Sequence, residues 1–311
     1  MVGENQHKPV LLDEALSGLI GQTDGVYIDG TFGRGGHSGA ILQALSAQGQ
    51  LLAIDKDMDA VTSSQAKVLL ADERFELAHG SFAQMQELVA DRQLLEKVDG
   101  ILLDLGVSSP QLDVAERGFS FMKDGPLDMR MDSTQGESAA QWLSHVEEYE
   151  LVKVLRVYGE EKFARKIAAQ IVLAREEKAI ETTAQLARLI ESVVKKREPG
   201  KHPATRSFQA IRIKINRELE DLELVLEQSA AILKKGGRLV VISFHSLEDR
   251  IVKRFMREQS RGVVVPRHLP MPLEVEALSY KCVGKAIKAS VDEVASNVRS
   301  RSAVLRIAEK L

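Results

Sequence analysis

Three aspartates stand where a side chain can reach a bound ligand. Asp29, Asp55 and Asp104 each directly follow a short apolar run: Val-Tyr-Ile, Leu-Leu-Ala-Ile and Ile-Leu-Leu, respectively. Such runs, bounded by polar or glycine-rich segments, are typical of buried parallel strands. In an open α/β sheet, ligands bind at the carboxyl ends of the strands. We therefore expect three carboxylates at neighbouring strand ends, close enough to share one ligand.

A glycine-rich loop follows the first of these aspartates. Gly30, Gly33, Gly35 and Gly36 fall within seven residues, and residues 38–47 have the pattern of a helix. Glycines allow positive φ and a close approach of the backbone to a ligand, and a helix N-terminus offers free N–H groups. Strand, loop and helix together predict a site for a nucleotide-like ligand.

The spacing of the loop narrows the choice of ligand. The dinucleotide fingerprint Gly-x-Gly-x-x-Gly, counted from Gly33 and Gly35, fails at Ser38. An acid followed by small residues at every second position resembles the first motif of S-adenosylmethionine (SAM) methyltransferases. In this resemblance, the carboxylate of Asp29 suits the ammonium group of methionine and would repel a pyrophosphate. Asp55 stands about twenty residues further on, where an acid accepts hydrogen bonds from ribose hydroxyls.

The next elements continue an α/β alternation. Residues 75–79 alternate as a third strand, and Ser81 is a plausible N-cap of the helix that follows. We expect Phe82 to form the apolar wall of the adenine site, although a plain core role is the alternative. Residues 236–244 predict a fifth strand. Residues 278–283 and 303–308 suit antiparallel last strands.

Composition sets limits on the class of protein. A chain of 311 residues can bury a full core and form one large or two modest domains. Its formal net charge of −3 gives no global attraction to nucleic acid. Cys282 is the single cysteine, which fits a reducing cytoplasm. No apolar run approaches the roughly 18 residues of a membrane span, and no signal-like segment opens the chain. We expect a cytoplasmic protein with no membrane partner.

A long irregular segment and a helical block interrupt the alternation. Residues 111–136 mix aromatic, methionine and charged side chains, which predicts an ordered functional loop beside the site. Residues 138–194 are mostly helical in pattern, and residues 208–233 predict one long helix. We expect a methyltransferase-like core in 1–112 and 206–311, with 113–205 as an inserted loop and helical domain for substrate recognition.

Six motifs in order resemble one family, the bacterial 16S rRNA cytosine-N4 methyltransferases of the MraW type. The resemblance covers nearly the whole chain. The motifs are Asp-Gly-Thr-Phe-Gly-Arg-Gly-Gly-His (29–37), Asp-Leu-Gly-Val-Ser-Ser-Pro-Gln (104–111), Arg-Gly-Phe-Ser-Phe (117–121), Gly-Pro-Leu-Asp-Met-Arg-Met (125–131), His-Pro-Ala-Thr-Arg (202–206) and Ser-Phe-His-Ser-Leu-Glu-Asp-Arg (243–250).

The resemblance implies a fold, a reaction and a set of contacts. The fold would be a doubly wound, Rossmann-like seven-stranded sheet with an inserted all-helical domain. The reaction would be SAM-dependent methylation of the exocyclic N4 of a cytosine, position 1402, in the decoding region of 16S rRNA. The substrate would be either the naked rRNA or the assembled small ribosomal subunit. The oligomeric state stays open between a monomer and a homodimer. The cofactor contacts carried over by position are Gly35, Gly36, His37, Asp55, Phe82, Asp104 and Gln111, beside Asp29 and Gly33 from the loop itself.

Cytosine N4 is a poor nucleophile, so an acceptor for its N–H bonds would help the transfer. Asp104 is the candidate, with a purely cofactor-positioning carboxylate as the alternative. Ser109 follows in a Ser-Ser-Pro segment that partly matches the loop of DNA amino methyltransferases but lacks the aromatic residue beside the proline. His245, at the end of the fifth strand, either contacts substrate or caps a helix. The candidate stacking rings are Phe119, Phe121 and Phe244.

Basic residues offer a track for phosphates, and no metal-ligand spacing is present. The track would combine residues 195–206 with Arg250, Lys253, Arg254 and Arg257; a solvated charged face is the alternative. The failed third glycine counts against a nicotinamide-dependent oxidoreductase, and the three intact aspartates count against a non-catalytic RNA-binding factor.

Overall fold

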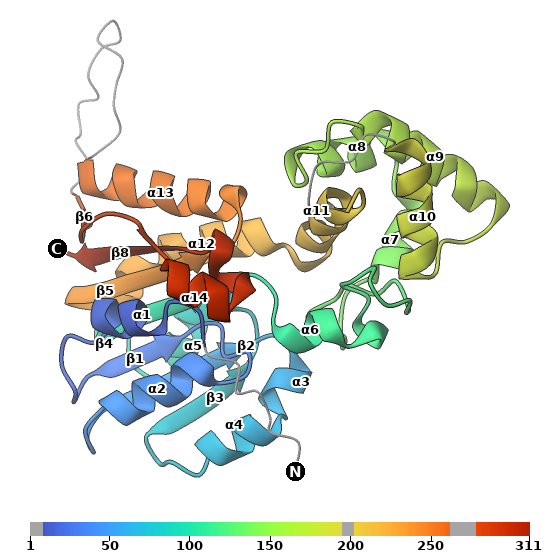
Figure 1. The fold of residues 1–311 in the computed structure, drawn as a ribbon. Coiled ribbons are helices and arrows are strands. Elements are labelled where there is room, and N and C mark those ends of the chain that lie inside the picture. Colours follow the sequence, from blue (N-terminus) through green and yellow to red (C-terminus); the bar gives the residue numbers. More distant parts are fainter. Residues whose placement is uncertain (1–8, 195–201, 262–277) are drawn as a thin grey trace, which may run out of the picture. The chain divides into compact units, whose positions relative to one another are not determined.

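The computed structural model describes residues 9–194, 202–261 and 278–311, and these form two compact units. We call them the sheet unit, Met1–Gly106 with Leu219–Leu311, and the helical unit, Val107–Glu218. Figure 1 shows the strands in the first unit and a cluster of helices in the second. The chain therefore leaves the sheet after the fourth strand and returns to it before the fifth.

The sheet unit is built on parallel strands with an antiparallel end. The strand order is β3-β2-β1-β4-β5-β8-β6. The first five are parallel, whereas β8 is antiparallel to β5, and β6 and β7 pair with successive parts of the same edge of β8. The bounds are β1 (Val26–Asp29), β2 (Gln50–Asp55), β3 (Phe75–His79), β4 (Val98–Asp104), β5 (Leu233–Ser243), β6 (Tyr280–Cys282), β7 (Ile287–Lys288) and β8 (Val304–Lys310).

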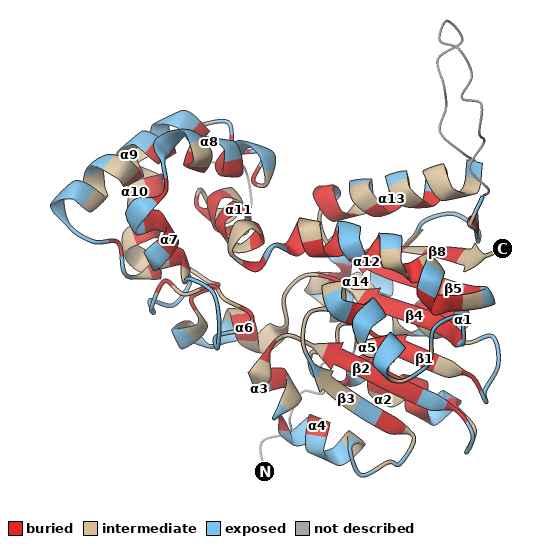
Figure 2. Ribbon diagram, turned by 180° about the vertical axis from the view of Figure 1, so that it is seen from behind, coloured by how far each residue is buried: buried red, intermediate tan, exposed pale blue. Residues whose placement is uncertain are grey.

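Helices cover both faces of this sheet, and the residues of the central strands β1, β2 and β4 are mostly buried (Figure 2). Tyr27 and Leu102 belong to one buried cluster, and their neighbours Ile28 and Leu103 belong to the other. α1 (Leu12–Leu19), α2 (Gly36–Ala44), α3 (Met58–Val61) and α4 (Ser64–Leu69) pack on the first face. α5 (Met85–Asp91), α12 (Glu218–Ile232) and α13 (Ser246–Arg261) pack on the second, and the remaining short elements are η1 (Phe82–Gln84), α14 (Val291–Ser296) and η3 (Val298–Ser302).

The helical unit has its own apolar core. Trp142, Leu155, Ile171 and Phe208 are buried in it. Each such side chain contributes roughly 1.5–3 kcal/mol by leaving water. Its elements are α6 (Ser109–Asp113), η2 (Ala115–Arg117), α7 (Ala139–His145), α8 (Glu148–Val157), α9 (Ala164–Glu177), α10 (Thr183–Val193) and α11 (Thr205–Asn216).

Most of the predicted elements are confirmed, including the antiparallel last strands. The long helix predicted over residues 208–233 is wrong. It divides into α11 and α12 because Arg217 has φ 53°, in the left-handed region, which ends α11. The predicted domain boundary at 205/206 also differs from the structure, because Phe208 and Ile211 of α11 are buried in the core of the helical unit.

Among the residues that the structure describes, no helix combines the length and apolarity of a membrane span.

Candidate active site

Asp29 stabilises the glycine loop after β1 through hydrogen bonds to the loop and to α2. This side chain is fully buried, and its Oδ1 accepts hydrogen bonds from the backbone N–H (3.0 Å) and the hydroxyl (3.3 Å) of Thr31. Its Oδ2 accepts one from the hydroxyl of Ser38 (2.6 Å) in α2. Gly33 and Gly35 take φ +54° and +71°, as the loop requires. Asp29 therefore shapes the loop, and a direct contact with a cofactor stays a prediction.

Asp55, at the end of β2, binds the same loop from the neighbouring strand. Its Oδ2 accepts the N–H of Gly33 (2.6 Å), and its Oδ1 accepts the N–H of Asp57 (2.8 Å). Burial raises the pKa of Asp55 to about 6; the two backbone hydrogen bonds oppose this rise, and the negative charges of Asp57 and Asp29 add to it. Any positively charged or hydroxyl-bearing ligand at this strand end would relieve that cost.

Asp104, at the end of β4, lies against the first turn of α2. Its Oδ2 is 3.4 Å from Nδ1 of His37, and its backbone N–H donates to the hydroxyl of Thr31 (2.7 Å). Its Oδ1 is buried and has no hydrogen-bond partner among the described residues. Burial raises the pKa of this carboxyl group to about 6; His37 lowers it, and Asp29 and Glu248 raise it. Asp104 thus presents an unused acceptor at the carboxyl edge of the sheet.

Phe82 lies beside the glycine loop, as expected. A β-carbon at Gly30 would lie 3.4 Å from Cβ of Phe82 and 2.6 Å from a methyl group of Leu103, so the two side chains pack closely on the loop. Ser81 closes the predicted cap: its hydroxyl accepts from the N–H of Ala83, within a capping box. The half-buried ring of Phe82 is therefore placed for an apolar wall, and the adenine contact itself stays a prediction.

Asp221 of α12 was not predicted from the sequence. Its Oδ2 lies 3.1 Å from Nζ of Lys56 and 2.8 Å from the hydroxyl of Ser81. Lys56 directly follows Asp55, and Ser81 directly precedes Phe82, so one buried carboxylate ties the two loops on this side of the site. Asp221 stands in an acid-rich helix with no motif around it, so the sequence carries no signal for this role.

His245 begins the turn between β5 and α13, where Glu248 engages its ring. Oε2 of Glu248 accepts the backbone N–H groups of Phe244 (2.8 Å) and His245 (3.2 Å). Nδ1 of His245 accepts the N–H of Glu248 (3.4 Å), and Nε2 lies 3.1 Å from Oε1 of the same residue. With Nδ1 as an acceptor, the proton of a neutral ring is assigned to Nε2. The geometry supports the capping alternative, and a substrate contact stays a prediction.

Ser109 and Gln111 belong to the helical unit, in α6. Oε1 of Gln111 accepts the N–H of Ser108 (2.9 Å), which closes a capping box. Their contact with substrate and cofactor stays a prediction. Phe119 and Phe121 also belong to this unit: the guanidinium of Arg117 lies over Phe119, and Phe121 stacks on His202 and packs edge-on against Phe208. Phe244 is the candidate stacking ring that belongs to the sheet unit, 3.5 Å from the β-carbon position of Gly106.

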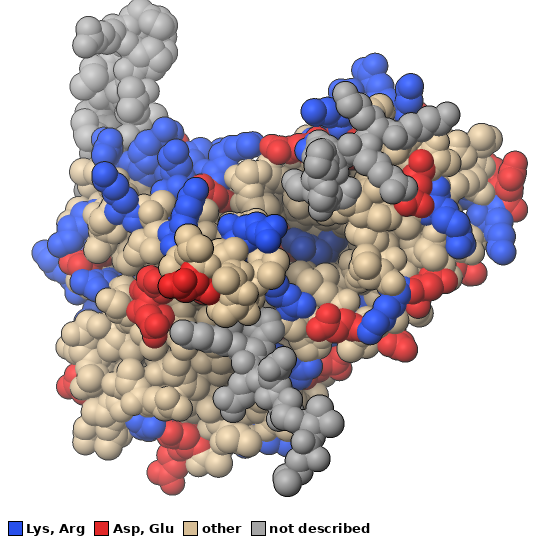
Figure 3. Space-filling view, in the orientation of Figure 1, with Lys and Arg blue, Asp and Glu red and all other residues tan. Residues whose placement is uncertain are grey.

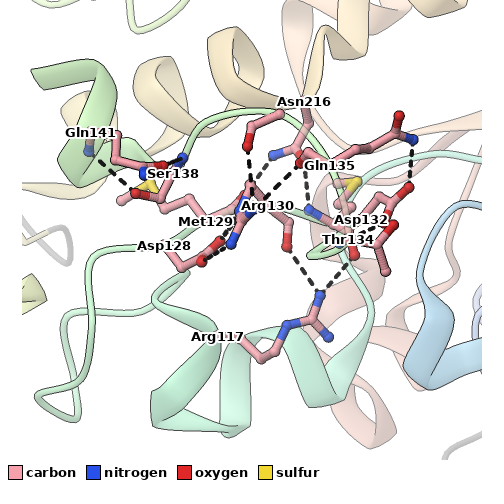
Figure 4. Close-up of polar contacts among 12 residues, drawn as sticks. Arg117, Asp128, Met129, Arg130, Asp132, Thr134, Gln135, Ser138, Gln141 and Asn216 are labelled. Carbon is pink, nitrogen blue, oxygen red and sulfur yellow. Dashed lines mark hydrogen bonds and ion pairs between the residues drawn. The ribbon is translucent and has the colours of Figure 1, made fainter.

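The irregular segment after α6 is ordered by polar contacts (Figure 4). Arg117 donates to the carbonyl oxygens of Arg130 (3.1 Å) and Met131 (2.9 Å). Asn216, at the end of α11, donates to the carbonyl of Met129 and accepts the N–H of Met131, both at 2.7 Å. The prediction of an ordered loop is confirmed, and its place beside the active site stays a prediction.

Basic side chains gather along α13 (Figure 3). Arg250, Lys253, Arg254 and Arg257 are exposed, and Arg254 pairs with Glu223 at 2.8 Å. The other part of the predicted track is residues 195–206. Residues 195–201 lie outside the described residues, and Arg206 donates to the carbonyl oxygen of Glu160 (2.8 Å). The four basic residues of α13 form an exposed basic surface on the sheet unit, and their binding of phosphates stays a prediction.

The fold and the site define a class. Parallel strands in the order β3-β2-β1-β4-β5, a glycine loop after β1 and a carboxylate at the end of β2 are typical of Rossmann-like methyltransferases. The profile of the MraW methylase family matches residues 4–311, and the chain belongs to this family. The predicted fold class, the family and methyl transfer from SAM are thereby confirmed.

The chain is similar to proteins that have been named for their activity. It is 55% identical over 313 residues to "Ribosomal RNA small subunit methyltransferase H" of Pseudoalteromonas atlantica, covering 100% of both chains. A methyltransferase homolog from Pyrococcus horikoshii is 12% identical, with a TM-score of 0.44 over 98% of this chain and 67% of that one. A SAM-dependent methyltransferase from Aquifex aeolicus is 9% identical, with a TM-score of 0.40 over 99% and 94%. Structural likeness at this level carries no argument about function.

Proposed function

We propose that this protein methylates the exocyclic N4 of a cytosine in the decoding region of 16S rRNA, using SAM. The observation that carries the proposal is the buried, unpartnered Oδ1 of Asp104 at the edge where β1, β2 and β4 end. An N–H of an amine would supply the hydrogen bond that this oxygen lacks among the described residues. The full-length similarity to a small-subunit rRNA methyltransferase supports rRNA as the source of that amine.

The residues at this edge fit the cofactor. Asp55 would accept hydrogen bonds from the ribose hydroxyls, Phe82 would flank adenine, and the backbone of Gly35 and Gly36 would approach the methionine part. Bound SAM supplies a methyl group that is already activated by its sulfonium charge. That charge also complements Asp55 and Asp104, whose raised pKa values show that burial opposes their ionised forms.

Asp104 has the central role toward the substrate. Its carboxylate accepts an N–H bond of the cytosine amine, which concentrates electron density on nitrogen and stabilises the positive charge that develops there. Ser109 is a second candidate contact to the amine, and Phe244 a candidate ring for the base. A base buried in a stack cannot reach this edge, so the cytosine must be extruded first.

The remaining parts of the chain would bind RNA. The exposed arginines and lysine of α13 would meet phosphates, and the helical unit would recognise the surrounding rRNA. The proposal places the protein in the cytoplasm with the small ribosomal subunit. It also requires that RNA binding weakens steeply with salt.

The test is transfer of a radiolabelled methyl group from SAM to small ribosomal subunits and to naked 16S rRNA from a strain lacking this protein. The labelled nucleoside is then identified by digestion and mass analysis. We expect a single N4-methylated cytosine in the decoding region. Label on another atom or another RNA would contradict the proposal, and RNA binding without any label would favour the non-catalytic alternative.

A further inference from the structure

Residues 9–11, which we call the strap, lie against the glycine loop and have no part in the chemistry described so far. A β-carbon at Gly36 would lie 2.5 Å from Cγ of Pro9, so the strap rests directly on the loop. The carbonyl oxygen of Val10 is 3.2 Å from Nε2 of His37. The N–H of Leu11 donates to Oε1 of Glu293 at 2.8 Å. The strap thus connects α14 to the first turn of α2.

Glu293 holds the strap in an uncommon conformation. Leu11 is fully buried and has φ +51°, in the left-handed region that a side chain such as leucine rarely adopts. Such a residue persists only where its surroundings fix it. Oε1 of Glu293 supplies the acceptor for its N–H. Glu293 itself is held at the start of α14, where its N–H donates to the hydroxyl of Ser290 (3.1 Å).

The strap fixes which nitrogen of His37 faces Asp104. A carbonyl oxygen can only accept, so Nε2 of His37 must carry a proton toward Val10. Nδ1 therefore faces Oδ2 of Asp104, at 3.4 Å. The two groups form an ion pair when the ring carries a proton on Nδ1 as well as on Nε2, because both nitrogens then donate. The His37 ring is buried, with 6% of its surface exposed, and cannot reorient freely.

We propose that Glu293 is a positioning residue for Asp104. Through the N–H of Leu11 and the carbonyl of Val10, it holds the His37 ring with Nδ1 toward the carboxylate. This inference rests on the proposed function, because it assigns Asp104 to the cofactor edge. It adds a remote residue, on the last helix of the chain, that controls the ionisation of that carboxyl group.

The charges around Asp104 give the direction of the effect. Asp29 of β1 and Glu248 of α13 raise its pKa, and the positive charge of the protonated His37 ring of α2 lowers it. If His37 is released, burial and two negative neighbours remain, so the pKa of Asp104 rises above about 6. Binding of the sulfonium cofactor requires the carboxylate and weakens as the pH falls through that pKa. Without Glu293, this loss therefore begins at a higher pH.

The experiment is titration calorimetry of the full chain with SAM between about pH 5 and pH 8. Glu293→Ala removes the acceptor, whereas Glu293→Gln keeps an oxygen for the N–H of Leu11. Asp292→Ala is the matched control, because Asp292 is an exposed acid on the same turn of α14. SAM affinity falls as the pH is lowered, and this fall has a midpoint pH. We expect that midpoint pH to be higher by about 0.5–1 unit in Glu293→Ala, with SAM affinity at pH 8 within about twofold of wild type. Glu293→Gln and Asp292→Ala should match wild type.

Two outcomes would overturn the inference. One is an unchanged midpoint in Glu293→Ala; the other is an equal loss of affinity at every pH, accompanied by a lower melting temperature, which marks a merely structural role. A second variant guards against misfolding: His37→Gln keeps a donor for the Val10 carbonyl but no ring toward Asp104, and it should raise the midpoint at least as much. If the pH shifts are observed but the protein does not label rRNA, only the proposed function is contradicted. If the wild-type protein does not bind SAM, both proposals are contradicted.

Discussion

At the scale of single residues, Asp104 lowers the stability of the fold and is also the proposed acceptor for the substrate amine. A carboxylate with one buried and unpartnered oxygen destabilises the fold, because its ionised form loses hydration at that oxygen. The pKa of Asp104 is raised from 3.8 to about 6. The loss of stability is therefore absent at low pH. It grows as the pH rises above the pKa of Asp104 in the unfolded chain, and it is complete above the pKa in the folded protein, about 6.

Replacing Asp104 should change stability and methyl transfer in opposite directions. Asp104→Asn keeps the shape and removes the charge, so at pH 8 we expect the free energy of unfolding to rise by about 1–3 kcal/mol. Methyl transfer at saturating SAM should fall by about 100-fold or more, because the charge-stabilising acceptor is lost. Denaturant unfolding at about pH 4 and pH 8, with single-turnover rates, measures both effects. Near-normal turnover would show that Asp104 only positions the cofactor.

At the scale of elements, α12 connects parts of the site that are distant in sequence. Asp221 binds the residue after Asp55 and the residue before Phe82. Gln228, two turns further along, donates to the carbonyl of Ala83 (2.8 Å) and accepts the N–H of Gln86 (3.1 Å). One helix therefore fixes the ends of β2 and β3 relative to each other.

Removing the contacts of Asp221 with Lys56 and Ser81 should lower the affinity for SAM. In Asp221→Ala the Lys56 ammonium and the Ser81 hydroxyl lose a shared partner, so we expect SAM to bind about 3–10-fold more weakly, in line with about 1 kcal/mol per lost polar interaction. Glu227→Ala is the control, since Glu227 is an exposed acid on the same helix. Calorimetry with SAM measures the change. Equal affinities in the two variants would show that these contacts serve only the fold.

The sequence predicted the sheet well, because a short apolar run ending in an acid is a local signal. The strand ends at Asp29, Asp55 and Asp104 follow from it directly. The break at Arg217 could not be predicted, because an arginine rarely adopts the left-handed conformation and the reason lies in packing: α11 is buried in one unit and α12 in the other. Asp221 and Glu293 could not be predicted either, because their partners are 140 or more residues away in the chain.

At the scale of the whole molecule, charge is distributed unevenly on a chain whose net charge is slightly negative. The formal charge of −3 leaves no general attraction to RNA. The exposed cations of α13 form a local patch in the sheet unit, the unit that also carries the carboxyl edge. Long-range attraction to rRNA then depends on a few side chains, which makes it testable.

Charge reversal on α13 should reduce RNA binding without affecting SAM. In the double variant Lys253→Glu and Arg257→Glu, we expect rRNA affinity to fall at least tenfold, and the slope of log affinity against log salt to become shallower by about 1.5–2. Lys67→Glu on α4 is the control, an exposed lysine outside the patch. Filter binding across a salt series measures both quantities. A slope equal to that of wild type would mean that α13 does not meet phosphates.

The central claim is that the edge formed by the glycine loop, Asp55 and Asp104 holds the methyl donor. A crystal structure of the full chain with SAM tests it most directly. We predict the ribose hydroxyls at Asp55, the adenine against Phe82, and the sulfonium methyl group directed toward the carboxyl group of Asp104. A donor bound elsewhere, or one with its methyl group turned away from Asp104, would contradict the account.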